Sequence, residues 1–145
     1  MDIFALLNQA KAEGASDLHL VVSSPPMLRI NGALLPIKGM EPLTQTDTIQ
    51  AFQQLATPEQ IDDFQQHLEL DFSYSLPDIG RIRCNAAKER RAISMVIRLL
   101  PAIIPSMQEL GLPEVCQDLV TKPRGLVVIS GPTGSGKSTT LAAMT

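Results

Sequence analysis

A phosphate-loop pattern near the end of the chain constrains its fold more than any other feature. Residues 131–138 read Gly-Pro-Thr-Gly-Ser-Gly-Lys-Ser and fill every fixed position of the pattern G-x-x-x-x-G-K-[ST]. Glycines let successive backbone N–H groups turn toward phosphates, and the lysine places a positive charge near the β- and γ-oxygens. The pattern therefore predicts a nucleoside triphosphate site, with Lys137 as the catalytic residue and Ser138 as the Mg²⁺ ligand. The predicted nucleotide-binding residues are Gly131, Pro132, Thr133, Gly134, Ser135, Gly136, Lys137, Ser138 and Thr139.

The segments on either side of this pattern support the interpretation. Residues 126–129, Leu-Val-Val-Ile, are typical of a buried parallel strand that leads into the loop. Residues 137–144 predict a helix, whose N-terminal N–H groups and dipole favour a bound anion. A glycine-rich turn that matches by chance is the alternative, and the preceding strand and the Lys-Ser pair disfavour it. Strand, loop and helix together indicate the start of a P-loop α/β domain.

The sequence ends at Thr145, before the later strands that usually orient Mg²⁺ and position the attacking water. We therefore expect the chain to be the front part of a larger enzyme and to hydrolyse little ATP by itself. The predicted strand at 126–129 would also lack its neighbours, so we expect loose packing after about Pro123. Good order there would instead indicate cover from another chain or a domain swap.

Composition limits the class of protein. With 145 residues, 44% of them apolar, the chain can bury the core of one complete domain plus the beginning of another. A net charge of −3 gives no general attraction to nucleic acid, which is not an expected partner. No segment resembles a signal peptide or a transmembrane span. Cys84 and Cys116 lack metal-ligand spacing, which favours reduced packing residues over a disulfide or zinc site and a cytoplasmic location.

Residues 1–100 predict an antiparallel sheet with helices on one side, an α+β fold. Asp2, Thr44 and Thr57 are placed to cap three helices, the last through a capping box with proline at the first helical position. The inward faces of these helices are predicted to carry Ile3, Leu6, Leu7 and Ala10, then Ile49, Phe52 and Leu55, then Ile61, Phe64 and Leu68. Strands are predicted over residues 17–21, 27–30, 33–36, 70–74, 81–87 and 92–100, with an Asn31-Gly32 hairpin turn.

A proline-containing stretch separates this sheet from the P-loop segment. Residues 101–113 hold three of the eleven prolines and one glycine, and a short helix is predicted near 114–120. We interpret 1–100 as one domain, 101–113 as an interdomain linker and 114–145 as the start of the ATPase domain.

Arginines in the last two strands suggest a second functional feature. Alternation places Arg81 and Arg83 on the face opposite the core, and a hairpin centred between Glu89 and Arg90 would set Arg98 beside Arg81. Like charges directly across a ladder destabilise it unless an anion lies between them, which suggests an anion site formed by Arg81, Arg83 and Arg98. The alternative is salt bridging to Asp71 and Glu69 on the neighbouring strand, and spacing alone leaves both open.

Four segments together resemble one known family. They are Ser16-Asp17-Leu18-His19, residues 25–32 (Pro-Pro-Met-Leu-Arg-Ile-Asn-Gly), residues 80–85 (Gly-Arg-Ile-Arg-Cys-Asn) and residues 125–141. The combination, which covers nearly the whole chain, resembles the secretion ATPases that power type IV pili and type II secretion. Within them it is most similar to the retraction ATPases of twitching motility, because the sheet domain begins directly at Met1.

The resemblance implies a PAS-like N-terminal domain, a linker and a RecA-like ATPase domain. It also implies a homo-hexamer that binds ATP and Mg²⁺ on the cytoplasmic face of the inner membrane, contacts a membrane platform protein and drives pilus disassembly. In this family, arginines of the first domain respond to the γ-phosphate, and the matching residues here are Arg83 and Arg98, with Arg81 secondary. Residues 86–90 depart from the family's aromatic and amide-rich stretch, and its acidic, Walker B and histidine motifs lie beyond Thr145.

Two other functions are alternatives to the motor. A short, non-hydrolysing accessory module could join hexamers of a complete homologue, and the position of the gene's stop codon would discriminate it from a motor. A P-loop kinase is disfavoured, because small kinases usually place the loop near the N-terminus and here it lies near residue 131.

Overall fold

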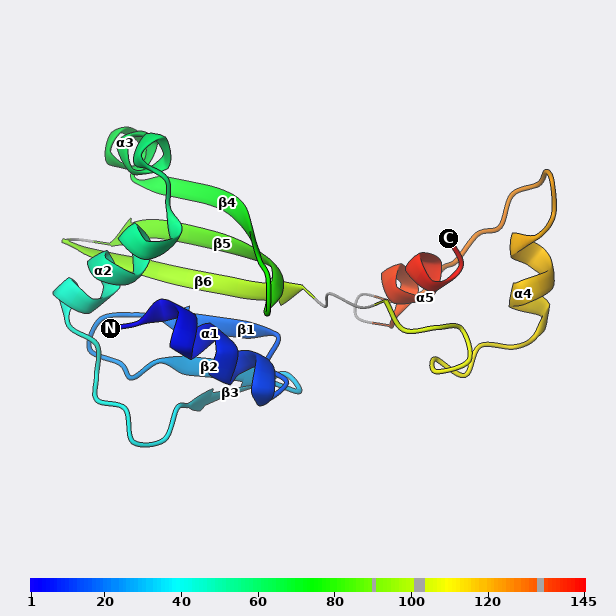
Figure 1. Ribbon diagram of the computed structural model, residues 1–145, viewed down its shortest axis with the longest axis horizontal. Helices are drawn as coiled ribbons and strands as arrows, with labels where there is room; N and C mark the ends of the chain where they lie inside the picture. Colours follow the sequence, from blue (N-terminus) through cyan, green and yellow to red (C-terminus); the bar gives the residue numbers. More distant parts are fainter. Residues whose placement is uncertain (90, 101–103, 133–134) are drawn as a thin grey trace. The chain divides into compact units, whose positions relative to one another are not determined.

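The chain forms two compact units, Met1–Ala102 and Ile103–Thr145 (Figure 1). The computed structural model describes residues 1–89, 91–100, 104–132 and 135–145. The first part of the predicted linker, residues 101–103, lies outside the described residues, so the linker limits stay a prediction.

The first unit is built on one six-stranded sheet in which each observed strand pairing is antiparallel. The strands are β1 (Asp17–Leu20), β2 (Met27–Ile30), β3 (Ala33–Pro36), β4 (Glu69–Leu76), β5 (Gly80–Glu89) and β6 (Ala92–Leu100). Their order across the sheet is β3-β2-β1-β6-β5-β4. The first strand of the chain therefore lies beside the last, and the predicted antiparallel sheet of an α+β fold is confirmed.

The three predicted helices form where their capping residues place them. They are α1 (Ile3–Ala12), α2 (Gln45–Leu55) and α3 (Pro58–His67). The Asp2 carboxylate accepts hydrogen bonds from the first turn of α1, and Thr44 and Thr57 each form a complete capping box. The Asn31-Gly32 turn has positive φ at both residues, 50° and 85°, as a type I′ hairpin turn requires.

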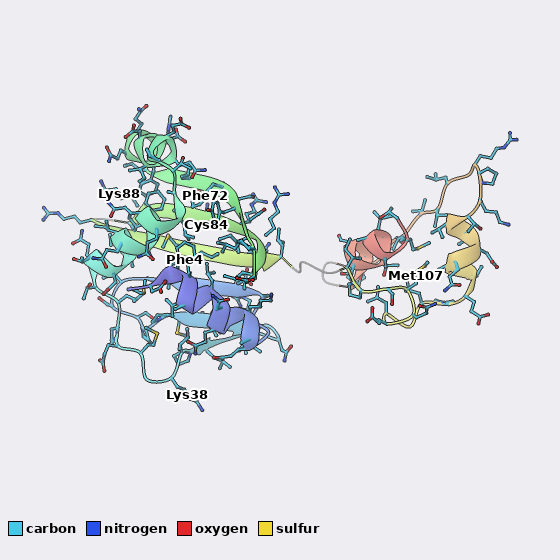
Figure 2. The ribbon with its side chains drawn as sticks, viewed as in Figure 1. Phe4, Lys38, Phe72, Cys84, Lys88 and Met107 are labelled. Atoms are coloured by element: carbon cyan, nitrogen blue, oxygen red, sulfur yellow. The ribbon has the colours of Figure 1, made fainter. Side chains whose placement is uncertain are left out.

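The core lies between these helices and one face of the sheet (Figure 1). Phe52 of α2, 2% exposed, is at its centre, with its ring 4.7 Å from that of Phe64 and 6.3 Å from that of Phe72. Figure 2 shows Phe72 and Cys84 on the sheet and Phe4 on α1. The prediction that Leu68 faces inward is wrong. Leu68 ends α3 in the left-handed conformation, φ 62°, and its side chain is 46% exposed, because the turn out of the helix rotates it away from the core.

The predicted register of the β5–β6 hairpin is wrong by two positions. Glu89 pairs with Ala92, so Arg98 lies directly opposite Arg83, and Arg81 lies opposite Leu100. The shift keeps every side chain on its predicted face, since the period of a strand is two. The turn sequence, which lacks Asn and Gly, does not mark its own centre, so the sequence leaves the register open.

The second unit contains α4 (Val115–Val120) and α5 (Lys137–Ala143). These two helices correspond to those predicted near residues 114–120 and at 137–144. The predicted strand at 126–129 does not form, and Leu126 and Val128 are 87% and 75% exposed. A parallel strand needs hydrogen-bonding neighbours, and residues 104–132 and 135–145 supply none. Loose packing after about Pro123 is therefore confirmed. Among the described residues, no helix combines the length and apolar character that crossing a bilayer requires.

Candidate functional site

The phosphate-loop pattern lies just before α5, with Lys137 as the first residue of that helix. Its Nζ atom donates hydrogen bonds to the carbonyl oxygens of Gly131, at 2.8 Å, and Pro132, at 2.5 Å. The lysine thus folds back over the start of its own loop, which places its ammonium group at the loop and away from the helix. Thr133 and Gly134, two of the predicted binding residues, lie outside the described residues.

Two glycines have backbone conformations that explain their place in the pattern. Gly136 has φ +86°, a left-handed conformation that side chains disfavour. Gly131 has φ +156°, and a Cβ atom there would lie 2.7 Å from the Ser135 Oγ atom. Ser138 is exposed beside Lys137. The open backbone, the ammonium group and the exposed hydroxyl are the donor set that a phosphate and its Mg²⁺ require, so the residues present fit such a ligand.

A row of four charged residues crosses the sheet of the first unit on the face opposite the core. Arg29 of β2 pairs with Asp17 of β1, Asp17 pairs with Arg98 of β6, and Arg98 pairs with Arg83 of β5. Each member lies directly opposite the next, so their side chains are neighbours. The structure therefore brings Arg83 and Arg98 together and adds a carboxylate beside them.

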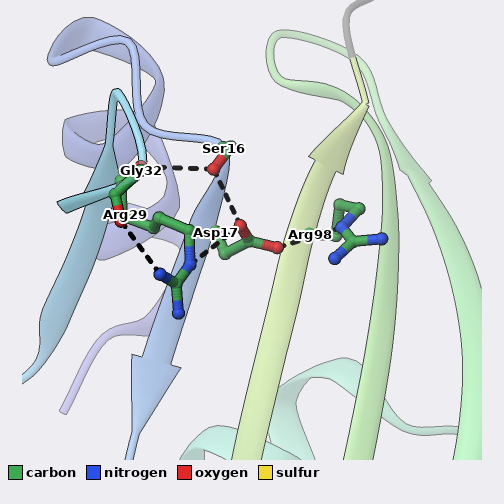
Figure 3. Close-up of polar contacts among 5 residues, drawn as sticks. All are labelled: Ser16, Asp17, Arg29, Gly32 and Arg98. Atoms are coloured by element: carbon green, nitrogen blue, oxygen red, sulfur yellow. Dashed lines mark hydrogen bonds and ion pairs between the residues drawn. The ribbon is translucent and has the colours of Figure 1, made fainter. Parts of the chain in front are cut away.

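Asp17 is the buried member of this row and lies between Arg29 and Arg98, as Figure 3 shows. Its side chain is 7% exposed, and its Oδ1 atom accepts a hydrogen bond from the Nε atom of Arg98 at 3.0 Å. Its Oδ2 atom accepts one from the Ser16 hydroxyl at 2.7 Å and lies 3.6 Å from the Nε atom of Arg29. Burial alone would raise the pKa of the Asp17 carboxyl, but the hydrogen bonds from Ser16 and Arg98, with the charges of Arg98 and His19, hold it below its usual value. Asp17 is therefore ionised at neutral pH.

Arg83 has an ion pair of its own with Asp71 of β4, at 3.6 Å between Nε and Oδ1. Both side chains are more than half exposed, so the pair is weakly held. A surface cavity of about 300 Å³ lies over this region. Its lining residues are Asp17, Asp71, Arg83, Asn85, Val96 and Arg98.

The remaining predicted residues lie elsewhere. Arg81 is exposed, pairs with Ser75 and Leu100, and does not line the cavity. Glu69, offered as a partner for the arginines, accepts a hydrogen bond from the Asn85 amide at 3.5 Å. Arg83 and Arg98 therefore lie side by side, and each also has a carboxylate partner, Asp71 for Arg83 and Asp17 for Arg98, whereas the anion site itself stays a prediction.

The sequence patterns predict no role for Asp17, Ser16 or Arg29. One signal was present in the sequence, since Asp17 is the only acidic residue of the apolar strand Asp-Leu-His-Leu. A carboxylate there calls for a cation on an adjacent strand. The strand order that provides Arg98, 81 residues away in sequence, cannot be read from local patterns.

Two further buried groups take no direct part in this site. Burial, then the charge of Arg29, lowers the pKa of His19, and its Nε2 atom is buried without a hydrogen-bond partner among the described residues. Burial raises the pKa of Cys84 to about 12, so this thiol is inert at neutral pH. Cys84 and Cys116 carry free thiols in this structure, and the prediction that both are reduced packing residues stays a prediction.

Comparison with known proteins places this chain in a family. The family model for type II/IV secretion system proteins matches residues 2–145. The chain belongs to this type II/IV secretion family. Its relatives within the family include the type IV pilus retraction ATPase PilT of Pseudomonas aeruginosa, 43% identical over 144 residues, or 99% of this chain and 42% of that protein. A twitching motility protein of Neisseria gonorrhoeae is 36% identical over 142 residues, or 98% of this chain and 38% of that protein.

A solved member of the family has the same fold. The crystal structure of the pilus retraction motor PilT with bound ADP matches 99% of this chain and 42% of its own chain, with a TM-score of 0.85 and 35% identity. The type II/IV secretion relatives named here are ATPases or motility proteins by name, and the chain spans about two fifths of their length. The resemblance seen in the sequence is confirmed at the level of the family.

Proposed function

We propose that this chain is the front part of an ATP-driven motor of the type IV pilus retraction and secretion family. The full-length motor would couple ATP hydrolysis to a domain movement that drives pilus disassembly. The observation that carries the proposal is an alignment of 99% of the chain with PilT at 43% identity, together with a complete phosphate-loop pattern. The 145-residue chain itself would turn over little ATP, because the strands that usually position water are not part of it.

The nucleotide site of this motor would be the loop at 131–139. Its backbone N–H groups would hold the phosphates, Lys137 would neutralise the β- and γ-oxygens, and Ser138 would ligate Mg²⁺. Bound Mg²⁺ would offset phosphate charge. The hydrogen bonds from Lys137 to the Gly131 and Pro132 carbonyls support this assignment, because they keep the ammonium group at the loop.

Arg83 and Arg98 would sense the γ-phosphate, with Arg81 in a secondary role. Guanidinium groups bind phosphate in a bidentate manner, and loss of the γ-phosphate would release them and so allow the first domain to move. Three features support this role. The two arginines lie directly opposite each other, their side chains are 63% and 64% exposed, and both line the same cavity.

The assembly proposed for the full-length protein is the one that the family resemblance implies. It would have a PAS-like domain at 1–100, a linker at 101–113 and a RecA-like ATPase domain beginning at 114. It would form a homo-hexamer on the cytoplasmic face of the inner membrane and contact a pilus platform protein. Membership of the type II/IV secretion family, which the chain shares with the pilus retraction ATPase PilT, supports this proposal.

Calorimetric measurement of ATP binding tests the nucleotide site. The measurement uses the protein encoded by the complete reading frame that contains these residues, together with its Lys137→Ala and Lys122→Ala variants. Lys122 is an exposed lysine of the same unit, so it controls for loss of surface charge. We expect binding to be lost in the Lys137 variant and kept in the Lys122 variant. Undiminished binding by Lys137→Ala would refute the proposed function.

A second comparison tests the motor itself. ATP hydrolysis is measured for the 145-residue chain and for the product of the complete reading frame. We expect turnover only in the longer protein. A reading frame that ends at Thr145, with no turnover, would favour the accessory module over the motor.

A further inference from the structure

We propose that Asp17 is a positioning residue that holds Arg98 in the orientation needed to contact a triphosphate. The inference rests on the proposed function, since it assigns a support to one of the two arginines named there. Asp17 would not touch the nucleotide. It would act through the guanidinium group of Arg98.

The contact between the two residues fixes one side of the guanidinium group. Asp17 and Arg98 are directly opposite each other on β1 and β6, and Oδ1 accepts from Nε at 3.0 Å. Asp17 is 7% exposed, whereas Arg98 is 64% exposed. In the part of the chain that the structure describes, Nε is the guanidinium atom of Arg98 that has a polar partner. Holding the arginine through Nε leaves its two terminal nitrogens for a phosphate, which they bind as a fork.

Asp17 is itself held in place from the opposite side. Its Oδ2 atom accepts the Ser16 hydroxyl at 2.7 Å and lies 3.6 Å from Arg29 Nε. Arg29 is anchored in turn, because its Nη1 atom donates to the Gly32 carbonyl at 3.1 Å (Figure 3). Each carboxylate oxygen of Asp17 therefore has its own partners, and the side chain cannot turn away without breaking them. This rigid support limits the orientations open to Arg98.

The charge of Asp17 also offsets a repulsion within the row. Arg83 and Arg98 are directly opposite each other, an arrangement that destabilises a ladder when no anion is near. The Asp17 carboxylate attracts Arg98 toward β1 and away from Arg83. Without that charge Arg98 would be free to swing outward, and the pair would no longer face one phosphate.

Arg83, the other arginine of the pair, is held less firmly by Asp71 than Arg98 is held by Asp17. Arg83 lies 3.6 Å from Asp71, and both of these side chains are more than half exposed. An exposed pair at that distance restrains a side chain weakly. On one side of the cavity, Arg98 is therefore held in place by Asp17. On the other side, Arg83 can change its orientation more easily.

The test measures discrimination between triphosphate and diphosphate in the full-length protein. The probes are ATPγS and ADP, and the readout is the ratio of their binding constants. Arg98→Ala should lower this ratio by about tenfold, the value of one hydrogen bond to a charged group. Asp17→Asn should lower it by about threefold or more, because the charge that holds Arg98 is lost. In the Arg98→Ala background, Asp17→Asn should have no further effect.

Matched variants separate positioning from a general loss of structure. Arg29→Gln removes the other ion pair of Asp17 but leaves the contact to Arg98, so it should lower the ratio less than Asp17→Asn does. Asp71→Asn makes the same chemical change on the exposed pair and should alter the ratio less than Asp17→Asn. Should Asp17→Asn fail to fold, Ser16→Ala removes the hydrogen bonds that the Ser16 hydroxyl donates to Asp17 Oδ2 and to the Arg29 carbonyl, at 2.7 and 3.3 Å, and should lower the ratio in the same direction.

The possible outcomes distinguish this inference from the proposed function. An unchanged ratio in Asp17→Asn, with a lowered ratio in Arg98→Ala, would overturn the positioning role and leave the sensing role standing. An unchanged ratio in Arg98→Ala would overturn the sensing role and the inference with it. Equal losses in Asp17→Asn and Arg29→Gln would also overturn the inference, because they would indicate a purely structural effect. Normal ATP binding by Lys137→Ala would refute the nucleotide site itself.

Discussion

Replacing Phe52 by leucine should destabilise the first unit by several times more than the same change at Phe4. Phe52 is 2% exposed and its ring lies 4.7 Å from Phe64 and 6.3 Å from Phe72, so it connects α2, α3 and β4. Phe4 is only partly buried on α1 and takes part in no aromatic pair within the described residues. The two substitutions thus compare a buried ring in two aromatic pairs with a partly buried ring in none among the described residues.

The magnitude follows from these two aromatic pairs. Each contributes about 0.5–1.5 kcal/mol beyond the area that it buries. Leucine also fills less of the space in a packed core, which adds about 1 kcal/mol, as for the loss of one buried methyl group. We therefore expect the free energy of unfolding to fall by about 2–4 kcal/mol in Phe52→Leu and by less than about 1 kcal/mol in Phe4→Leu.

Urea unfolding of the 145-residue chain, followed by tyrosine fluorescence, measures this difference. The chain has one tyrosine, Tyr74 on β4, and no tryptophan, so the signal reports the first unit alone. The midpoint for Phe52→Leu should fall by about 1–2 M at an unchanged slope. Equal midpoint shifts in the two variants would show that the aromatic pairs do not provide the extra stability, and would refute the reasoning.

Three further effects should follow from single features of the structure. The pKa of Asp17 is lower in the folded chain than in the unfolded chain, so the stability that its ionised carboxylate contributes is complete above about pH 4 and is lost as the pH falls through the folded pKa. Asp17→Asn should therefore weaken the dependence of the urea midpoint on acid pH. One thiol, Cys116, should react with a disulfide reagent at pH 8 in the folded chain, and both should react in urea, because Cys84 is buried with a pKa of about 12. Thr57→Ala should cost about 1 kcal/mol in urea unfolding, since it removes the hydroxyl that accepts the N–H of Gln60 at 3.3 Å.

Each of these effects has an outcome that would contradict it. An unchanged acid dependence in Asp17→Asn would argue against the lowered pKa. Rapid reaction of two thiols in the folded chain would show that Cys84 is accessible. For the helix cap, Thr46→Ala is the matched control, because Thr46 is exposed on α2 outside any cap, and a similar loss there would rule out a capping effect.

Local sequence signals determined much of the first unit. Asp2, Thr44 and Thr57 marked the starts of three helices, and Asn31-Gly32 marked the hairpin between β2 and β3. Each signal acts over about four residues, because a capping side chain bonds the first helical turn and a type I′ turn needs positive φ at two adjacent residues. The phosphate-loop pattern is equally local, so the residue types of the proposed nucleotide site were also readable from the sequence.

The pairing between distant strands was decided only by the tertiary structure. The β5–β6 register placed Arg83, not Arg81, opposite Arg98, and the strand order placed Asp17 beside it. The predicted strand at 126–129 failed for a related reason, since no described neighbour in its unit pairs with it. A strand's own residues set which side chains share a face, but its partner and register depend on distant segments, such as β6, whose Arg98 lies 81 positions from Asp17. The sequence alone therefore determined the arginines as candidates, and the fold determined that a buried carboxylate holds one of them.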